Sequence, residues 1–290
     1  MKKVWRIIGA VLFWSAVVAY FVFATLLRVG NERERRVERI EVVVTDADQR
    51  SFITPEKVFS LLQNEGIDPI GKRVDSIDLA GINGAIKEYC FTADAKTYVD
   101  YSGKLTIKVS QRAPLLRVRN NEGYDFYLTR GGYVLPVEPH ATLNLPIVTG
   151  SLTLPFGKSF RGSLAEWFEG SEKKYRENCN FLSKLINFVV YLEESEWEGG
   201  KCVQIDLTAP TTKSTKKGSE EPRIELIPRT GNYIVEFGKL EQVEEKMYRW
   251  RRFVESKVVD LEGGRLNVEF EGQALWRAPK QTKTTKKKSI

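Results

Sequence analysis

The chain has 290 residues, of which 42% are hydrophobic and 29% are charged, and its formal net charge is +7. This composition is typical of globular proteins and excludes an intrinsically disordered chain, a collagen-like repeat and a transporter with many membrane spans. Eight of the cations lie in residues 1–6 and 280–290, and taking these eight charges from +7 leaves −1 for the rest of the chain. The body is therefore balanced in charge and gives no indication of nucleic-acid binding.

The first long apolar run extends from Ile7 to Leu27 without a charged residue. About 20 apolar residues cross the hydrocarbon core of a bilayer as a helix. The sequence therefore predicts one transmembrane helix at 7–27, after a short head at 1–6 and before a juxtamembrane linker at 28–36. A cleaved signal peptide ending near Ala24 is the alternative, but the run exceeds the roughly 7–15 apolar residues of such peptides. Basic residues lie on both sides of the run, so charge counting leaves the orientation open.

Residues 37–112 are predicted to form a small sheet backed by two helices. A strand rich in β-branched residues is expected at 40–44. The first helix begins after Thr54, which is a suitable N-cap, and the second begins after Asp78. An alternating hairpin with strands at 95–99 and 105–109 completes the order β-α-α-β-β.

Residues 113–278 are predicted to form a mixed β domain, which makes the whole chain α+β. A long helix is expected at 171–193, and an amphipathic helix carries its apolar stripe between Leu240 and Val254. The polar stretch 211–221 is expected to be a flexible loop, and 279–290 a disordered basic tail. The predicted strands are 126–128, 133–135, 147–148, 203–207, 223–227, 233–237 and 266–270.

The sequence shows no arrangement of residues that is typical of catalysis. His140 is the only histidine and lies in a proline-bounded loop, so a nucleophile would lack a positioned base. Cys90, Cys179 and Cys202 are widely spaced without a CxxC pair; we interpret them as buried small residues, although a disulfide between two of them stays an alternative. The acidic cluster at 193–198 is interpreted as a solvated helix end. We therefore expect no enzyme activity, no metal and no cofactor.

The last predicted strand contains Leu266, Val268 and Phe270, and Trp276 follows it. A strand that ends a fold can lie at a sheet edge, where a partner strand adds through main-chain hydrogen bonds. The alternative interpretation is an ordinary core strand. The residues alone leave both interpretations open.

The order of these elements resembles the bacterial cell-division family called FtsQ or DivIB. The module at 37–112 looks like a POTRA domain, and the segment Leu105–Pro114 is similar to the family's strand followed by an Arg-x-Pro turn. The segment Phe126–Pro136 resembles the next hairpin of the family, with Thr129 and Arg130 where an acidic residue is expected. The closing β region of the family resembles residues 233–238, the following helix at 240–256 and the strand at 266–270.

The resemblance implies a single-pass inner-membrane protein with a cytoplasmic N-terminus and a periplasmic body. It further implies a scaffold without catalytic activity that links FtsB- and FtsL-type proteins to other divisome components controlling septal peptidoglycan synthesis. The POTRA-like module is implied to contact upstream divisome proteins. The last strand is implied to receive a strand from an FtsB-type partner near Leu266, Val268, Phe270 and Trp276. Contact with membrane lipid is expected, and no contact with nucleic acid.

Two alternatives come from other functional classes. A POTRA-bearing chaperone or assembly module would serve envelope proteins rather than division proteins. A periplasmic cell-wall hydrolase is disfavoured, because the sequence has no His or Cys/His arrangement suited to catalysis.

Overall fold

The computed structural model describes residues 2–33, 35–46, 51–139, 143–170, 176–208 and 221–279. The chain divides into two compact units, residues 1–112 and 113–290, which are described separately. Residues 211–220 of the predicted loop at 211–221, residues 280–290 of the predicted tail at 279–290, and His140 lie outside the described residues.

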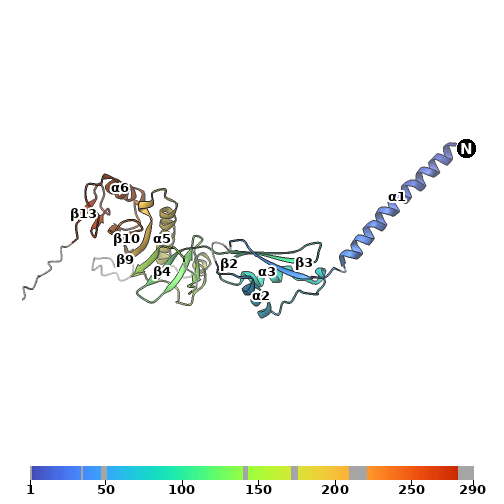
Figure 1. Ribbon diagram of the computed structural model, residues 1–290, viewed down its shortest axis with the longest axis horizontal. Helices are drawn as coiled ribbons and strands as arrows, with labels where there is room; N and C mark the ends of the chain where they lie inside the picture. Colours follow the sequence, from blue (N-terminus) through green and yellow to red (C-terminus); the bar gives the residue numbers. More distant parts are fainter. Residues whose placement is uncertain are drawn as a thin grey trace, which may run out of the picture. The chain divides into compact units, whose positions relative to one another are not determined.

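The first unit begins with helix α1, Lys2–Arg33, which contains the apolar run of the sequence (Figure 1). The structure does not describe every side chain of this run; those of Ile7, Ile8, Leu26 and Leu27 are among the ones left out. Among the described residues, no helix is both long enough and apolar enough to cross a membrane.

The rest of this unit is a three-stranded sheet with two helices, as the sequence predicts. The strand order is β1-β3-β2; β1 runs parallel to β3, and β2 runs antiparallel to it. Val58 and Leu62 of α2, Ile82 and Ile86 of α3, and the inner face of β3 form the buried core. The elements are β1 Arg39–Val44, α2 Pro55–Asn64, the 3-10 helix η1 Val74–Ser76, α3 Leu79–Lys87, β2 Thr92–Val99 and β3 Lys104–Gln111.

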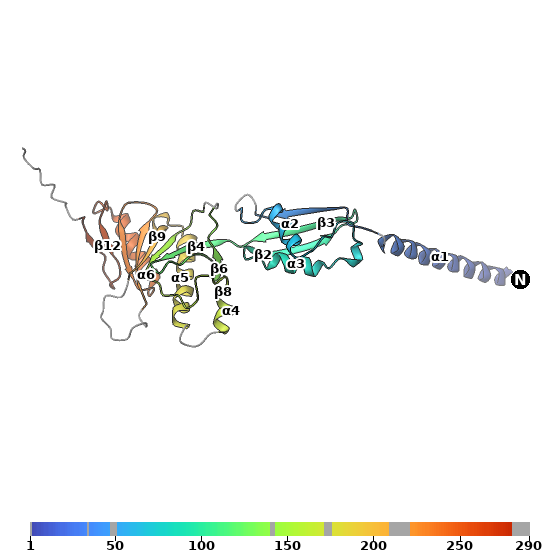
Figure 2. The same cartoon turned by 90° about the horizontal axis from the view of Figure 1, so that it is seen from below.

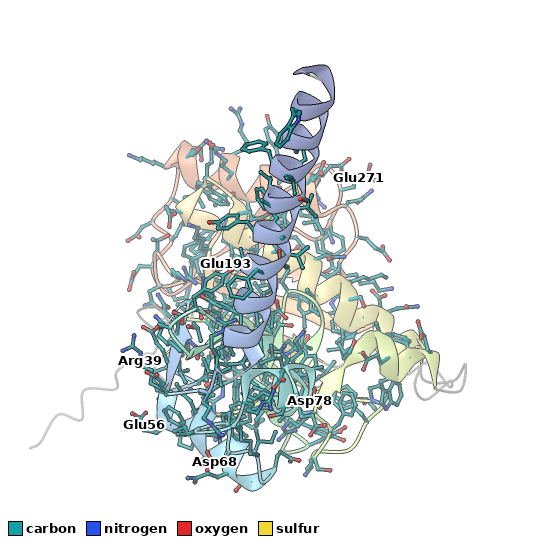
Figure 3. All side chains as sticks on the ribbon, turned by 90° about the vertical axis from the view of Figure 1, so that its right-hand side faces the viewer. Arg39, Glu56, Asp68, Asp78, Glu193 and Glu271 are labelled. Carbon is teal, nitrogen blue, oxygen red and sulfur yellow. The ribbon has the colours of Figure 1, made fainter. Side chains whose placement is uncertain are left out.

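Both predicted helix starts are confirmed. The hydroxyl of Thr54 accepts a hydrogen bond from the Lys57 N–H at 3.3 Å, and the Asp78 carboxylate accepts one from the Gly81 N–H at 2.8 Å. These side chains satisfy N–H groups that have no partner within the helix. Glu56 and Asp78, at the starts of the two helices, are exposed (Figure 3).

The second unit is built on a ten-stranded mixed sheet with helices packed on it (Figure 2). Its strand order is β13-β12-β11-β10-β9-β7-β4-β5-β6-β8. The strands are β4 Pro114–Asn120, β5 Asp125–Thr129, β6 Tyr133–Pro136, β7 Ile147–Gly150, β8 Gly162–Ser163, β9 Cys202–Thr208, β10 Arg223–Pro228, β11 Ile234–Gly238, β12 Arg265–Asn267 and β13 Leu275–Arg277. The helices are α4 Leu164–Glu169, α5 Arg176–Glu194, the 3-10 helix η3 Glu198–Gly200 and α6 Val243–Ser256.

One continuous core joins the sheet to α5 and α6. Phe188 of α5 packs on Phe237 of β11 with ring centroids 5.1 Å apart. Trp250 of α6 is fully buried, packs edge-on against Trp197 and donates a hydrogen bond to the Tyr233 hydroxyl at 3.1 Å. The helix stripe read from the sequence therefore faces the sheet.

The helix predicted from Leu240 begins later, at Val243. Gln242 precedes it with φ of 51°, a left-handed conformation in which the chain turns into the helix. The helix predicted from Ser171 is described from Arg176 onward, because 171–175 lie outside the described residues. Sequence reasoning did not identify α4, β4, β8 or β13.

Candidate partner-binding edge

The predicted last strand is corrected by the structure in both length and position. We expected a strand at 266–270 that could end the sheet, but β12 covers only Arg265–Asn267. It pairs parallel with β11 on one side and antiparallel with β13 on the other. The strand at this edge of the sheet is therefore β13, the strand at the other edge is β8, and β12 is internal.

The four predicted partner-binding residues fall into two groups. Leu266 and Val268 are 0% exposed and belong to the apolar core. Phe270 is 49% exposed, and Trp276 is partly exposed on β13. Leu266 and Trp276 are direct cross-strand partners, whereas Phe270 lies beyond the end of β12. Of these four residues, only Phe270 and Trp276 present side-chain surface to a partner.

The direction of the main-chain groups in β12 follows from two hydrogen bonds with β11. Ile234 N–H donates to the Gly264 carbonyl, and Val268 N–H donates to the Glu236 carbonyl, each at 3.1 Å. Successive residues of a strand alternate in direction. Leu266, midway between Gly264 and Val268, therefore also directs its main-chain groups to β11.

The same alternation fixes the outer side of β13. Arg265 and Asn267 direct their main-chain groups away from β11, toward their partners Arg277 and Leu275 on β13. The main-chain N–H and C=O of Trp276, between those two partners, therefore point to the outer side of the sheet. In the described part of the chain no further strand follows β13 in the sheet.

The Trp276 indole ring lies over a residue without a side chain. An ideal Cβ at Gly264 would approach Trp276 Cζ2 at 2.1 Å and Cη2 at 2.2 Å, so the ring occupies the space that any larger residue would need. The ring also lies next to Phe253 of α6, with centroids 6.5 Å apart. These contacts hold the edge strand against the core through its one large aromatic residue.

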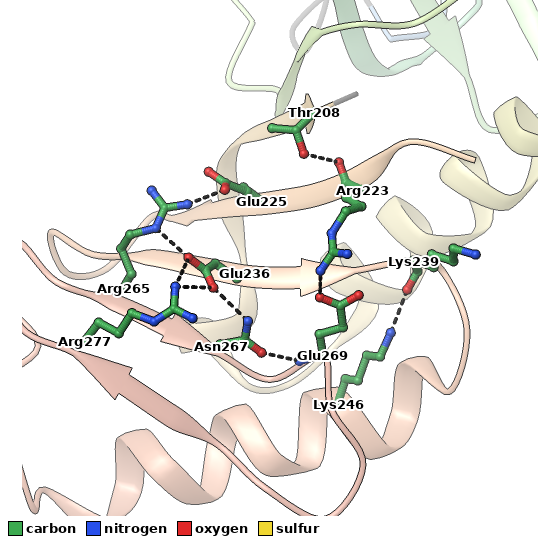
Figure 4. A network of polar contacts seen from close by, with 10 residues as sticks. All are labelled: Thr208, Arg223, Glu225, Glu236, Lys239, Lys246, Arg265, Asn267, Glu269 and Arg277. Atoms are coloured by element: carbon green, nitrogen blue, oxygen red, sulfur yellow. Dashed lines mark hydrogen bonds and ion pairs between the residues drawn. The ribbon is translucent and has the colours of Figure 1, made fainter. Parts of the chain in front are cut away.

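On the opposite face of the sheet, Glu236 is the centre of a charged network that reaches β13 (Figure 4). Its carboxylate accepts hydrogen bonds from Arg265 Nε at 2.7 Å and from Asn267 Nδ2 at 2.7 Å. Arg277 Nη1 contacts both of its oxygens, at 3.3 and 3.4 Å. Arg265 also forms an ion pair with Glu225 on β10. Arg277 thus links β13 to β11 across the intervening strand.

The charges of this network change the acidity of its members. Burial alone would raise the pKa of Glu236, but the hydrogen bonds from Arg265 and Asn267 and the charge of Arg277 together outweigh it and lower that pKa. The hydrogen bond to Glu236 raises the pKa of Arg265. Both side chains are therefore charged near neutral pH, as an ion-pair network across strands requires.

A second set of polar contacts fixes the chain after β12. Glu269 forms an ion pair with Arg223 on β10, and its carboxyl group lies against Gly238, whose φ is +74°. Lys246 of α6 is buried, lies 5.2 Å from the Phe237 ring centroid, and donates a hydrogen bond to the Lys239 carbonyl at 2.7 Å (Figure 4). Burial lowers the pKa of Lys246. The ion pair of Glu269 thus links the segment after β12 to β10.

Two other candidate groups of the sequence, Cys202 and the acidic cluster at 193–198, lie in the described part of the chain. Cys202 is buried, and burial raises the pKa of its thiol to about 12, so it is not a nucleophile at neutral pH. Two glutamates of the acidic cluster are engaged in ion pairs with arginines, Glu193 with Arg229 and Glu194 with Arg130. Among the described residues no group of His, Cys, Asp and Glu is arranged to hold a metal ion.

Sequence reasoning missed Leu275 and Arg277 at the edge and Arg265 and Glu236 behind it. The strand β13 has three residues and shows no extended alternation, so periodicity could not reveal it. The available signal was Gly272 two residues before the run Ala-Leu-Trp-Arg at 274–277, because a turn residue shortly before an apolar and aromatic run is typical of a strand start.

The two units together define a class of protein: a POTRA-like domain followed by an α+β domain that ends in an open sheet edge. A family model described as a POTRA-like domain matches residues 35–110. A second, described as FtsQ/DivIB, C-terminal related, matches residues 113–274, which is more than half of the chain. The chain therefore belongs to the FtsQ/DivIB family of cell-division scaffold proteins. No curated protein matches the chain in a sequence search.

Proposed function

We propose that this chain is a membrane-anchored divisome scaffold whose apolar run from Ile7 to Leu27 crosses the inner membrane. The head at 1–6 lies in the cytoplasm and the two units lie in the periplasm. The uncharged run is of spanning length, and its large side chains are not covered by protein: Trp14 is 65% exposed and Phe23 is 62% exposed. A helix that exposes such residues is favourable in lipid and unfavourable in water. The family, whose members are membrane-anchored, supports the same assignment.

The scaffold binds an FtsB-type partner, together with its FtsL-type companion, by adding a strand from that partner to β13. One observation carries this proposal: the N–H and C=O groups of Trp276 point outward at the edge of the ten-stranded sheet. Phe270 and the indole of Trp276 supply apolar contact area beside the new strand. Leu266 and Val268 act from the core by supporting β12.

Two substitutions at one position test strand addition. Trp276→Ala removes the indole and keeps the main-chain N–H, whereas Trp276→Pro removes both. We expect Trp276→Pro to bind the FtsB-type partner about tenfold more weakly than Trp276→Ala, since a partner carbonyl loses its donor at a cost of about 1–1.5 kcal/mol. Affinity is measured with the full chain in detergent, and circular dichroism verifies folding. Equal affinities of the two variants would exclude a main-chain hydrogen bond at this residue.

The POTRA-like domain contacts upstream divisome proteins, so the chain links early and late components and helps control septal peptidoglycan synthesis. The presence of this domain directly before the sheet domain supports a two-ended scaffold. Depletion should give filamentous cells without septa. Envelope defects in cells of normal length would instead favour a chaperone or assembly module for envelope proteins.

A further inference from the structure

Three segments of the first unit come together where the chain leaves α1. Gly71 N–H donates to the Val37 carbonyl at 2.8 Å, and Val37 N–H donates to the Lys72 carbonyl at 3.0 Å. On the other side, Glu38 N–H donates to the Gly103 carbonyl at 2.9 Å. These bonds fix two loop tips on either side of one extended segment. We name this surface the juxtamembrane platform; it consists of residues 35–38, 70–73 and 101–103.

Each loop tip of the platform exposes a large side chain. Ile70 is 56% exposed and Tyr101 is 81% exposed. Single exposed apolar residues are common on protein surfaces, so exposure alone has no meaning. Here the two residues lie on neighbouring loops that are bonded to the same segment, and each is accompanied by cations.

The cations of the platform are Arg35, Arg36, Lys72 and Arg73. The Arg35 guanidinium lies 5.2 Å from the Tyr101 ring centroid, and Arg36 Nη1 donates to the Gly71 carbonyl at 2.8 Å. Such a guanidinium stays charged while its aromatic neighbour covers one face. The result is a surface with apolar tips surrounded by positive charge.

Acidic side chains around the platform reduce this charge only in part. Arg73 forms an ion pair with Asp75 at 2.8 Å, and the Asp68 carboxylate accepts a hydrogen bond from Ile70 N–H at 3.2 Å. Residues 35–39 and 68–75 together contain five cations and three acids, which leaves +2. Arg35, Arg36 and Lys72 form no ion pair with another described residue. The surface therefore keeps cations that are available to an anionic ligand.

The chain itself brings this platform close to lipid. Helix α1 ends at Arg33, six residues after the end of the apolar run. Six helical residues extend about 9 Å, and the platform begins two residues later. The headgroup layer is about 5–8 Å thick on each side of the hydrocarbon core. When α1 spans the bilayer, its end therefore lies at about the outer surface of the headgroup layer, and the long side chains of Arg35 and Arg36 can reach back to the headgroups.

We propose that the juxtamembrane platform docks on the anionic headgroups of the membrane that holds α1, a proposal that rests on the anchor of the proposed function. The cations contact headgroup phosphates, and Ile70 and Tyr101 enter the interfacial layer, where aromatic and apolar side chains are favoured. Docking restricts the orientation of the POTRA-like domain relative to the membrane. The POTRA-like domain would then hold its partner-binding surface at a fixed distance from the membrane.

A polarity-sensitive fluorescent residue placed at Ile70 by stop-codon suppression tests this docking and leaves the cysteines unchanged. The full chain is reconstituted into vesicles of phosphatidylcholine, with or without phosphatidylglycerol. We expect a blue shift of emission at position 70 in phosphatidylglycerol vesicles, reversed in about 1 M salt, where the Debye length is about 3 Å. The matched control carries the fluorescent residue at position 88 in place of Glu88, which is exposed. Glu88 lies just before β2, at the opposite end of the β2–β3 hairpin from Tyr101. That control should show no shift.

Charge variants separate docking from general attraction. Lys72→Glu should abolish the blue shift, whereas Lys96→Glu, at an exposed lysine in the middle of β2, should preserve it. A probe at position 70 that stays as water-exposed as the probe at 88 in anionic vesicles would overturn the docking. Flotation with phosphatidylcholine vesicles tests the anchor separately: a chain that does not float would overturn the anchor and docking together, whereas a floating chain with a water-exposed probe overturns docking alone.

Discussion

The absence of a side chain at Gly264 makes room for the Trp276 ring and thereby for the edge strand. In a Gly264→Ala variant the new methyl carbon would lie 2.1 Å from Trp276 Cζ2 and 2.8 Å from the Arg277 carbonyl oxygen. Such contacts are far shorter than van der Waals distances, and the Arg277 carbonyl belongs to β13 itself. We therefore expect the ring and the edge strand to be displaced together.

The cost of this displacement follows from the contacts that would be lost or strained. Inserting one methyl group into a packed site costs about 1–3 kcal/mol when the neighbours cannot relax. The Trp276 ring has Phe253 on one side and the partner Leu266 across the strand pair, so its freedom to relax is small. If the cost is concentrated in β12 and β13, local opening of these strands becomes roughly 5- to 150-fold more frequent.

Hydrogen exchange of the full chain in detergent measures this opening directly. Peptides that cover 264–277 should lose protection by that factor in Gly264→Ala, and peptides from β4 and β5 should not change. Gly157→Ala is the matched control, because a Cβ there meets nothing within 4 Å and its φ is ordinary. Unchanged exchange at 264–277 would mean that the ring moves aside freely and that Trp276 does not hold β13 in place.

The remaining predictions concern the charge network, one buried thiol and one helix cap. Arg265→Met should destabilise the second unit by about 1 kcal/mol in urea unfolding, since Glu225 then loses its cation opposite its cross-strand partner Glu236, which keeps only the longer contact with Arg277. Because the pKa of Glu236 is lowered, its carboxylate stabilises the folded state fully above the ordinary glutamate pKa of about 4.3, and this stabilisation is lost as the pH falls below that value. In urea unfolding at different pH values, Glu236→Gln should remove this acid dependence. Burial raises the pKa of the Cys202 thiol to about 12, so the folded state loses stability as the pH rises above the ordinary cysteine pKa of about 8.5. Iodoacetamide at pH 8 should label Cys202 only after unfolding. Thr54→Ala should cost about 1 kcal/mol in the stability of α2 whereas Thr54→Ser should not, which thermal unfolding can measure.

Local signals in the sequence were sufficient for the first unit. Thr54 and Asp78 cap the two helices as their residue types predict, and the alternating hairpin places Ile107 and Val109 in the core. Each of these features depends on residues within a few positions of one another. Capping and alternation are local effects, so they can be read without knowledge of the tertiary structure.

The edge of the second unit is formed by pairing between segments that are distant in the sequence. Hydrophobic periodicity within one segment does not reveal which other segment pairs with it. Alternation placed Leu266, Val268 and Phe270 on one face of a strand; the first two are 0% exposed and the third is 49% exposed. It could not show that β12 has neighbours on both sides, because the same alternation fits an internal strand and an edge strand. Burial of Leu266 depends in part on β13, a strand of three residues that is too short for alternation to reveal.

This difference between an internal and an edge strand decides which experiment can test strand addition. A proline at Val268 is the natural choice if that residue lies on the outermost strand. In the structure its N–H donates to the Glu236 carbonyl at 3.1 Å, its carbonyl accepts from Arg249 Nη2 at 3.2 Å, and its side chain is fully buried. Val268→Pro would therefore disrupt the sheet itself, and loss of partner binding would report unfolding of the edge. At Trp276 the main-chain N–H is directed away from the sheet, so a proline there removes a donor that only a partner strand would use.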